Sequence, residues 1–175
     1  MSEEAKSPCP YADGLEEYPL GFVAGQNLLY LVYFAVGFLG MSSLRLGGYP
    51  VVSLAYVAFL AVMLLVVLRK HICTHCYYYG KRCGTGWGRL AALLFARGSG
   101  NYRLGVKLAA VTWMVATVVP VVGTAFALVL HYSPSKLALL GVFLLLTPAV
   151  LLFHRASCAS CRVRNVCPAS MVRSG

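Results

Sequence analysis

The stretch VVSLAYVAFLAVMLLVVL, at residues 51–68, contains no charged side chain. A helix of about 20 such residues crosses the ~30 Å hydrocarbon core of a bilayer. Three further apolar runs of similar character lie at residues 20–44, 108–130 and 137–153. The sequence therefore predicts an all-α, polytopic integral membrane protein with four transmembrane helices.

The composition of the chain favours the same class of protein. Apolar residues make up 59% of the sequence and charged residues 11%, against about 45–50% and about 25% in typical globular domains. All acidic side chains lie in the first 17 positions, and none follows Glu17. This distribution excludes paired-carboxylate catalysis, a carboxylate metal cage and an intramembrane carboxylate proton relay. Whether the chain is an enzyme stays open.

The basic residues predict the orientation of the chain in the membrane. Of 15 Lys and Arg residues, eight lie between residues 69 and 107 and four between residues 155 and 173. The two short links carry only Arg45 and Lys136. By the positive-inside rule, the long loop and both termini are expected to be cytoplasmic. Nucleic acid is not an expected partner despite the net charge of +10, because no basic helix stands clear of the membrane. The expected partners are membrane lipid and other subunits of a membrane complex.

Two cysteine triplets follow the second and fourth apolar runs. Each begins with C-x2-C, a spacing at which two thiolates can bind one metal ion, and each adds a third cysteine. Structural disulfides are not expected in the reducing cytoplasm. The sequence therefore predicts zinc or an iron–sulfur cluster bound at cytoplasmic cysteine knuckles, with the following ligands: Cys73, Cys76, Cys83, Cys158, Cys161 and Cys167.

Four arrangements of these cysteines stay open. In the first, the two C-x2-C pairs share one four-thiolate zinc site, whose knuckles resemble those of zinc ribbons. In the second, each triplet takes a histidine, His71, His75 or His154, as its fourth ligand. A third arrangement is an iron–sulfur cluster, since the spacing resembles ferredoxin runs less closely. The fourth is a redox dithiol at Cys73 and Cys76. Cys9 has no partner at knuckle spacing and is expected to be a spectator.

The two triplets also suggest an internal duplication. Cys158 follows Cys73, and Cys161 follows Cys76, by the same interval (158 − 73 = 161 − 76 = 85). Short links make antiparallel hairpins, so the halves are expected to form a 2+2 parallel repeat. The predicted organisation is a polar tail at 1–18, a hairpin with a cysteine-rich loop at 19–107, and a hairpin with a cysteine-rich tail at 108–175.

Smaller motifs carry further expectations. Tyr77 to Tyr79 are expected to anchor the chain at the membrane interface. Gly21-x3-Gly25 marks either a close helix contact or a loose helix start. Residues 84–88 read as a flexible glycine turn before a short interfacial helix at 89–95. The loop around the first triplet shows no core of its own, so metal binding is expected to order it.

Three functions fit these observations. The first is an accessory, assembly or sensing module of a membrane complex, in which a cytoplasmic metal site clips two helical hairpins together. The second is an iron–sulfur subunit that passes electrons to a quinone or a partner. The third is a transporter or lipid-handling protein with a structural zinc site, although ion-coupled transport lacks the usual intramembrane carboxylate.

Overall fold

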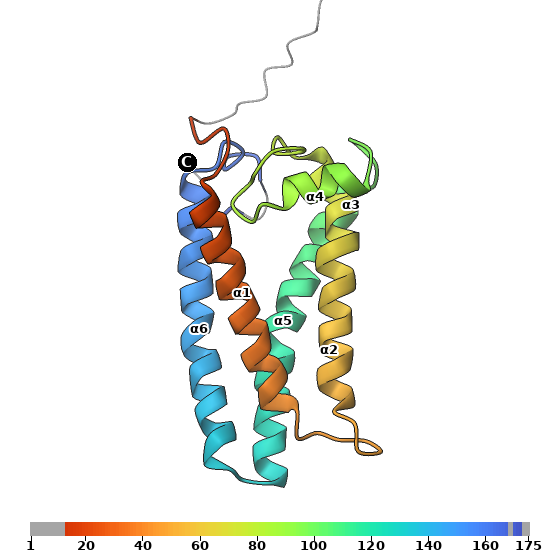
Figure 1. The fold of residues 1–175 in the computed structure, drawn as a ribbon, viewed down its shortest axis with the longest axis vertical. Coiled ribbons are helices and arrows are strands. Elements are labelled where there is room, and N and C mark those ends of the chain that lie inside the picture. The colour runs from red at the N-terminus through yellow and green to blue at the C-terminus, as the bar shows by residue number, and fades with distance from the viewer. Residues whose placement is uncertain (1–12, 168–169, 173–175) are drawn as a thin grey trace, which may run out of the picture.

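Four helices dominate the fold. The computed structural model describes residues 13–167 and 170–172, and within them there is no β-strand. Its helices long and apolar enough to cross a membrane are Leu20–Met41, Val51–His75, Tyr102–Leu130 and Pro134–Ala159. They lie side by side, with α1 and α5 running in one direction and α2 and α6 in the other (Figure 1). The predicted all-α class with four potential membrane spans is confirmed.

The second span continues beyond its predicted end at Leu68. It consists of α2 (Val51–Val62), a π-helical turn η1 (Met63–Val67), α3 (Leu68–His71) and a 3-10 turn η2 (Cys73–His75). π turns within α-helices often occur at functional sites. Because η2 begins at Cys73, the first cysteine triplet starts at the end of this span.

The last two spans are also longer than predicted. Helix α5 (Tyr102–Leu130) begins six residues before the predicted start, because the Asn101 side chain accepts a hydrogen bond from the Leu104 backbone N–H at 3.1 Å and so caps the helix. Helix α6 (Pro134–Ala159) begins with a proline in its first turn, a favourable position for that residue. Because α6 continues to Ala159, Cys158 belongs to the helix and not to the tail.

Close contact between α1 (Leu20–Met41) and α5 depends on a glycine near the middle of the bundle. A Cβ on Gly37 would lie 3.0 Å from the Pro120 ring. Small residues let transmembrane helices approach each other in this way. The predicted contact at Gly21 and Gly25 is wrong, because a Cβ on Gly21 would meet nothing within 4 Å and one on Gly25 only Phe153 at 4.0 Å.

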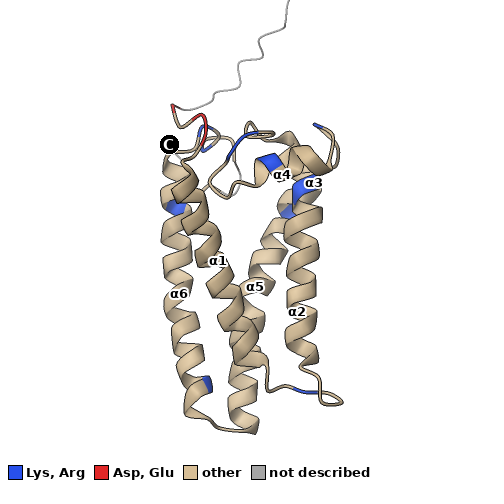
Figure 2. Cartoon of the chain, in the orientation of Figure 1, with Lys and Arg blue, Asp and Glu red and all other residues tan. Residues whose placement is uncertain are grey.

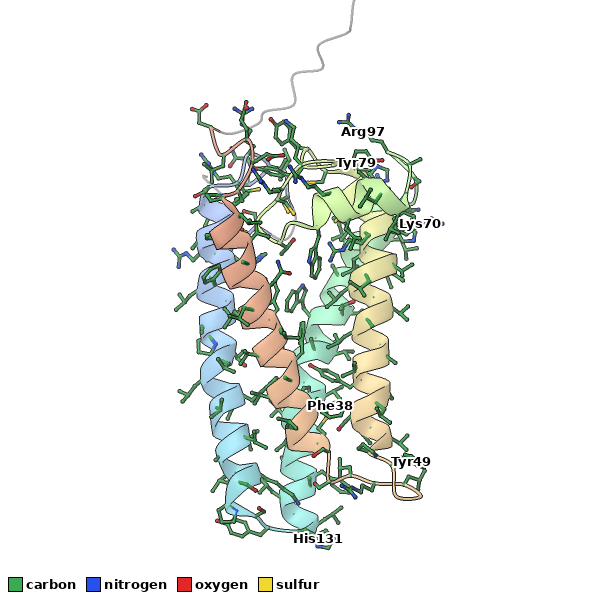
Figure 3. All side chains as sticks on the ribbon, viewed as in Figure 1. Phe38, Tyr49, Lys70, Tyr79, Arg97 and His131 are labelled. Atoms are coloured by element: carbon green, nitrogen blue, oxygen red, sulfur yellow. The ribbon has the colours of Figure 1, made fainter. Side chains whose placement is uncertain are left out.

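One end of the bundle carries most of the charge. Helix α4 (Trp87–Leu94), which corresponds to the predicted short helix at 89–95, lies across this end beside α3 (Figure 1). Lys and Arg gather there, whereas Arg45 and Lys136 mark the opposite end (Figure 2). Lys70, Tyr79 and Arg97 lie at the charged end, and His131 lies at the other (Figure 3). We call the charged end the cysteine end, because both cysteine triplets belong to it.

Candidate metal centre

The first triplet begins on the end of the second span. The Cys76 backbone N–H bonds to the Cys73 carbonyl at 3.3 Å, which closes the turn between the two thiols. Arg69, one helical turn earlier, donates from Nη1 to the Cys73 sulfur at 3.1 Å. Cys83 lies further along the loop, with its sulfur 3.3 Å from the Thr85 hydroxyl.

Arg69 is a buried cation with no carboxylate partner in the part of the chain that the structure describes. Arg69 is 4% exposed. Its guanidinium carbon lies 3.2 Å from the centre of the Trp87 ring. Its Nε and Nη2 have no hydrogen-bond partner among the described residues. Burying an uncompensated charge is costly. Because no acidic side chain follows Glu17, the neighbouring thiols are the groups best placed to supply the opposite charge.

The second triplet begins inside α6. Cys158 is buried, and its sulfur lies 3.5 Å from Nε2 of His154, one turn earlier. The Cys161 backbone N–H bonds to the Cys158 carbonyl at 3.1 Å. The backbone N–H of Cys167 bonds to the Val163 carbonyl at 2.8 Å, so the tail forms a further turn.

The two triplets adjoin each other. Cys76 and Cys83 from the loop and Cys161 from the tail pack against one buried cluster, which consists of Tyr18, Val23 and Tyr78. Burial, together with the nearby Cys73, Cys83 and Cys161 thiols, raises the pKa of the Cys76 thiol to about 12. Burial likewise raises the pKa of Cys161, and the Cys167 and Cys158 thiols add to that shift. A negative charge on Cys161 of the second triplet therefore raises the pKa of Cys76 in the first.

Tyr78 connects three segments of the chain around this cluster. It is 1% exposed, donates its hydroxyl to the Leu15 carbonyl at 2.6 Å and accepts from the Arg162 backbone N–H at 3.2 Å. Tyr18 is buried as well and donates to the Ser157 carbonyl at 2.6 Å. The prediction that Tyr78 is a membrane-interface anchor is therefore wrong, because both its ring and its hydroxyl have protein partners.

The segment before α1 is part of the cysteine end. The Leu15 backbone N–H bonds to the Ser160 carbonyl, and the Tyr18 backbone N–H to the Arg82 carbonyl, each at 3.0 Å. Glu17 also pairs with Arg82 at 2.9 Å. The sequence predicted a polar tail here, either loose or a short surface segment, and no core in the loop. For the described residues, the loose tail and the missing core are both wrong. The available signal was the cluster of Asp13, Glu16 and Glu17, the last carboxylates before the basic loop and tail.

The histidines differ in their surroundings. His71 accepts from the Asn101 backbone N–H at 2.9 Å through Nδ1, and Nε2 of His75 lies 3.3 Å from the Gly100 carbonyl. Both therefore support the link that leads into α5. Among the described histidines, His154 is the one whose contact with a candidate cysteine, Cys158, is seen.

The glycine segment before α4 is tightly packed. A Cβ on Gly84 would collide with the Ser157 hydroxyl, and one on Gly88 with the Tyr78 carbonyl. Gly86 adopts a φ of +73°, a conformation that favours glycine. The interpretation of this segment as a flexible turn is therefore wrong: its glycines allow close approach between the loop, α4 and α6.

The side chains offer ligands without forming a coordination shell. All six triplet cysteines are free thiols. Within residues 13–167 and 170–172, no three His, Cys, Asp or Glu side chains converge on a point that could hold a metal ion. Cys9 lies outside the described residues. The donor chemistry and the adjacent cations suit a thiolate-bound metal, and side-chain rotation would be needed to bring three or more sulfurs together.

No protein-family model, no curated protein and no solved structure matches this chain.

Proposed function

We propose that the cysteine end binds zinc or an iron–sulfur cluster and that the metal clips two helical hairpins, arranged as a parallel repeat, on the cytoplasmic side of the membrane. The protein would then serve as an accessory, assembly or sensing module of a larger membrane complex. The observation that carries this proposal is the adjacency of Cys76 and Cys161, which come from different triplets and pack on one tyrosine cluster.

Electrostatics supports the proposal. Arg69 is buried beside Cys73, and the loop and tail add Arg82 and Arg162 near the cluster, where they contact Glu17 and Glu16. A metal held by several thiolates keeps a net negative charge, which a buried guanidinium would compensate. If the thiols of the two triplets were neutral, the Arg69 charge would have no counter-ion among the described residues.

The test is metal content combined with single substitutions. We expect protein purified without oxygen to carry stoichiometric zinc, or iron with visible absorption. Cys76→Ser and Cys161→Ser should each lose the metal if the two triplets share a site, whereas Cys9→Ser should retain it. Wild-type protein without metal, or metal content unchanged in both triplet variants, would overturn the proposal.

The orientation is tested separately. Charge at the cysteine end supports a cytoplasmic location for both triplets by the positive-inside rule. A membrane-impermeant maleimide should leave Cys83 and Cys161 unlabelled in intact cells and should modify them in inverted vesicles after metal removal. Labelling from outside the cell would refute the cytoplasmic assignment while leaving the metal proposal intact.

A second candidate function is electron transfer through an iron–sulfur cluster. It is favoured by a cavity between α5 and α6 that extends to Cys167, a predicted ligand. A redox-active centre beside an apolar cavity could exchange electrons with a membrane-soluble carrier. Iron and acid-labile sulfide, together with an electron paramagnetic resonance signal after reduction, would support this function over a zinc clip.

A further inference from the structure

A cavity of about 360 Å³ lies within the bundle, between α1, α5 and α6. Its volume falls within the range of small-molecule sites, which are about 300–1,000 Å³. It runs from Thr117 and Thr147, in the middle of α5 and α6, to Tyr102, His154 and Cys167 at the cysteine end. The cavity therefore joins the membrane-spanning part of the bundle to the candidate metal centre.

The cavity opens towards the membrane. Ala110 on α5 and Leu151 on α6 line it, and both are exposed on the outer surface of the bundle. In a bilayer these positions face lipid, because both helices belong to the spans. A ligand would thus enter sideways from the hydrocarbon phase.

The lining combines aromatic faces with a few hydroxyl groups. The rings of Tyr30 and Trp113 lie 5.5 Å apart between centroids. At the deep end, the Tyr33 hydroxyl lies 3.3 Å from the Thr117 hydroxyl and 3.4 Å from that of Thr147, which are long separations for O–H···O bonds. The Thr147 hydroxyl donates its proton to the Phe143 carbonyl at 2.9 Å, so Tyr33 and Thr117 are the hydroxyls of this group that can donate to an acceptor on a ligand.

Tyr30 provides a second donor nearer the cysteine end. Its hydroxyl accepts a hydrogen bond from Nε2 of Gln26 at 2.9 Å. The hydroxyl proton can then be donated to an acceptor in the cavity. The donors at Tyr30 and at the Tyr33–Thr117 pair are thus separated along an otherwise apolar, aromatic cavity.

We propose that this cavity binds a lipid-soluble quinone, with the flat ring against the Tyr30 and Trp113 side chains and the apolar tail in the lateral opening. A quinone has acceptor oxygens at both ends of its ring, and these match the two groups of donors. An acyl chain would leave the donors unpaired, which is costly in an apolar site. A water-soluble molecule would not match the apolar lining or the lateral entry. The binding does not depend on the metal proposed above and is tested without it.

The two tryptophans of the chain make a matched pair of reporters. Trp113 lines the cavity, whereas Trp87 lies outside it beside Arg69. In Trp87→Phe protein, Trp113 is the remaining tryptophan, and in Trp113→Phe protein, Trp87 is. Each variant is placed in lipid nanodiscs after metal removal and titrated with oxidised decylubiquinone in the absence of reductant.

We expect saturable quenching of Trp113 fluorescence and only linear, collisional quenching of Trp87. In the Trp87→Phe background, Ala110→Phe should fill the cavity and abolish saturation, whereas Val111→Phe, at an exposed neighbouring position outside the cavity lining, should not. Tyr30→Phe should weaken binding about three- to ten-fold, the loss expected for one hydrogen bond.

Three results would overturn the proposal. They are linear quenching of both tryptophans, saturation that persists in Ala110→Phe, and an affinity unchanged by Tyr30→Phe. Nanodiscs with brominated acyl chains provide the remaining comparison. If the brominated lipid quenches Trp113 and decylubiquinone does not displace it, the cavity holds ordinary lipid and the quinone assignment is wrong. Because the metal is absent throughout, failure here leaves the metal-centre proposal untouched.

Discussion

The Arg69 guanidinium donates to the Cys73 sulfur at 3.1 Å from one helical turn away. The carbon of the same guanidinium lies 3.2 Å from the centre of the Trp87 ring, and Arg69 is buried. An arginine in this setting favours an anionic partner, because a buried cation loses the solvation that water would provide. The charge of the candidate metal centre can therefore be tested by substituting Arg69.

Removing the Arg69 charge should weaken metal binding. Arg69→Met keeps an apolar side chain against Trp87 but removes a hydrogen bond to a charged sulfur, which contributes about 1.5–3 kcal/mol. We expect metal affinity, measured by competition with a chelator, to fall at least roughly ten-fold. The control is Arg89→Met, because the Arg89 side chain is 56% exposed and its ion pair with Glu17 is long, at 3.7 Å. Equal affinity in both variants would contradict the electrostatic role.

Tyr78→Phe should loosen the contact between the loop, the tail and the segment before α1. The substitution keeps the ring but removes the hydrogen bonds to Leu15 and Arg162, each expected to contribute about 0.5–1.5 kcal/mol. Hydrogen exchange should become faster in residues 13–18 and 160–166. Tyr79→Phe is the control, since its hydroxyl bonds to Phe95 instead. Unchanged exchange in Tyr78→Phe would show that packing alone holds the segments.

The pKa shifts of Cys76 and Cys161 predict how the metal-free protein responds to pH. Burial raises the pKa of Cys76 from its ordinary value of 9.0 to about 12 and raises that of Cys161. The folded state therefore favours the neutral thiols, and this stabilisation is complete below pH 9 and is lost as pH rises towards 12. Thermal unfolding of metal-free protein should occur at lower temperature as pH increases above 9.

Metal binding should show the opposite trend. Ligation requires thiolates, so protons compete with the metal and affinity should increase with pH.

In the metal-free protein at pH 7.5, iodoacetamide should modify Cys76 more slowly than a cysteine in an unfolded peptide, with a rate that rises with pH. Fast modification of Cys76 at neutral pH, read by mass spectrometry, would contradict the burial of this thiol.

Gly88→Ala should disrupt the packing of α4 against the loop. The added Cβ would collide with the Tyr78 carbonyl and lie 2.6 Å from that of Lys81. Overpacking of this kind costs about 1–3 kcal/mol, more than the gain in helix propensity. We expect limited proteolysis to cut residues 73–95 faster. Gly141→Ala in α6 is the matched control, because nothing lies within 4 Å of its added Cβ. Equal proteolysis in the two variants would contradict the packing argument.

The fold class could be predicted from the sequence because each span is an uninterrupted apolar run, such as residues 51–68. The ends of the spans could not, since Asn101 and Pro134 start their helices within polar segments. The cysteine spacing indicated candidate ligands, and the structure brings Cys76, Cys83 and Cys161 together. That contact depends on long-range partners, and a local pattern does not reveal them.

The tyrosines illustrate the same limit. Tyr77 to Tyr79 form a run that is typical of a membrane interface, yet each hydroxyl has a different environment. Tyr79 bonds to Phe95 within the loop, Tyr77 accepts from Arg162 at 3.0 Å, and Tyr78 is buried between segments. Composition predicts that such residues lie near the headgroups, but only tertiary contacts decide which of them turn inward.

The contact between Leu15 and Ser160 has a consequence for the order of biosynthesis. Leu15 is synthesised 145 residues before its partner (160 − 15 = 145), and all four spans lie between Leu15 and Ser160. The N-terminal segment must therefore wait, beside a partly built bundle, until α6 has left the ribosome. Closure of the cysteine end is consequently a late event, and a ribosome stalled before Ser160 would hold a nascent chain with inserted helices and an open terminus.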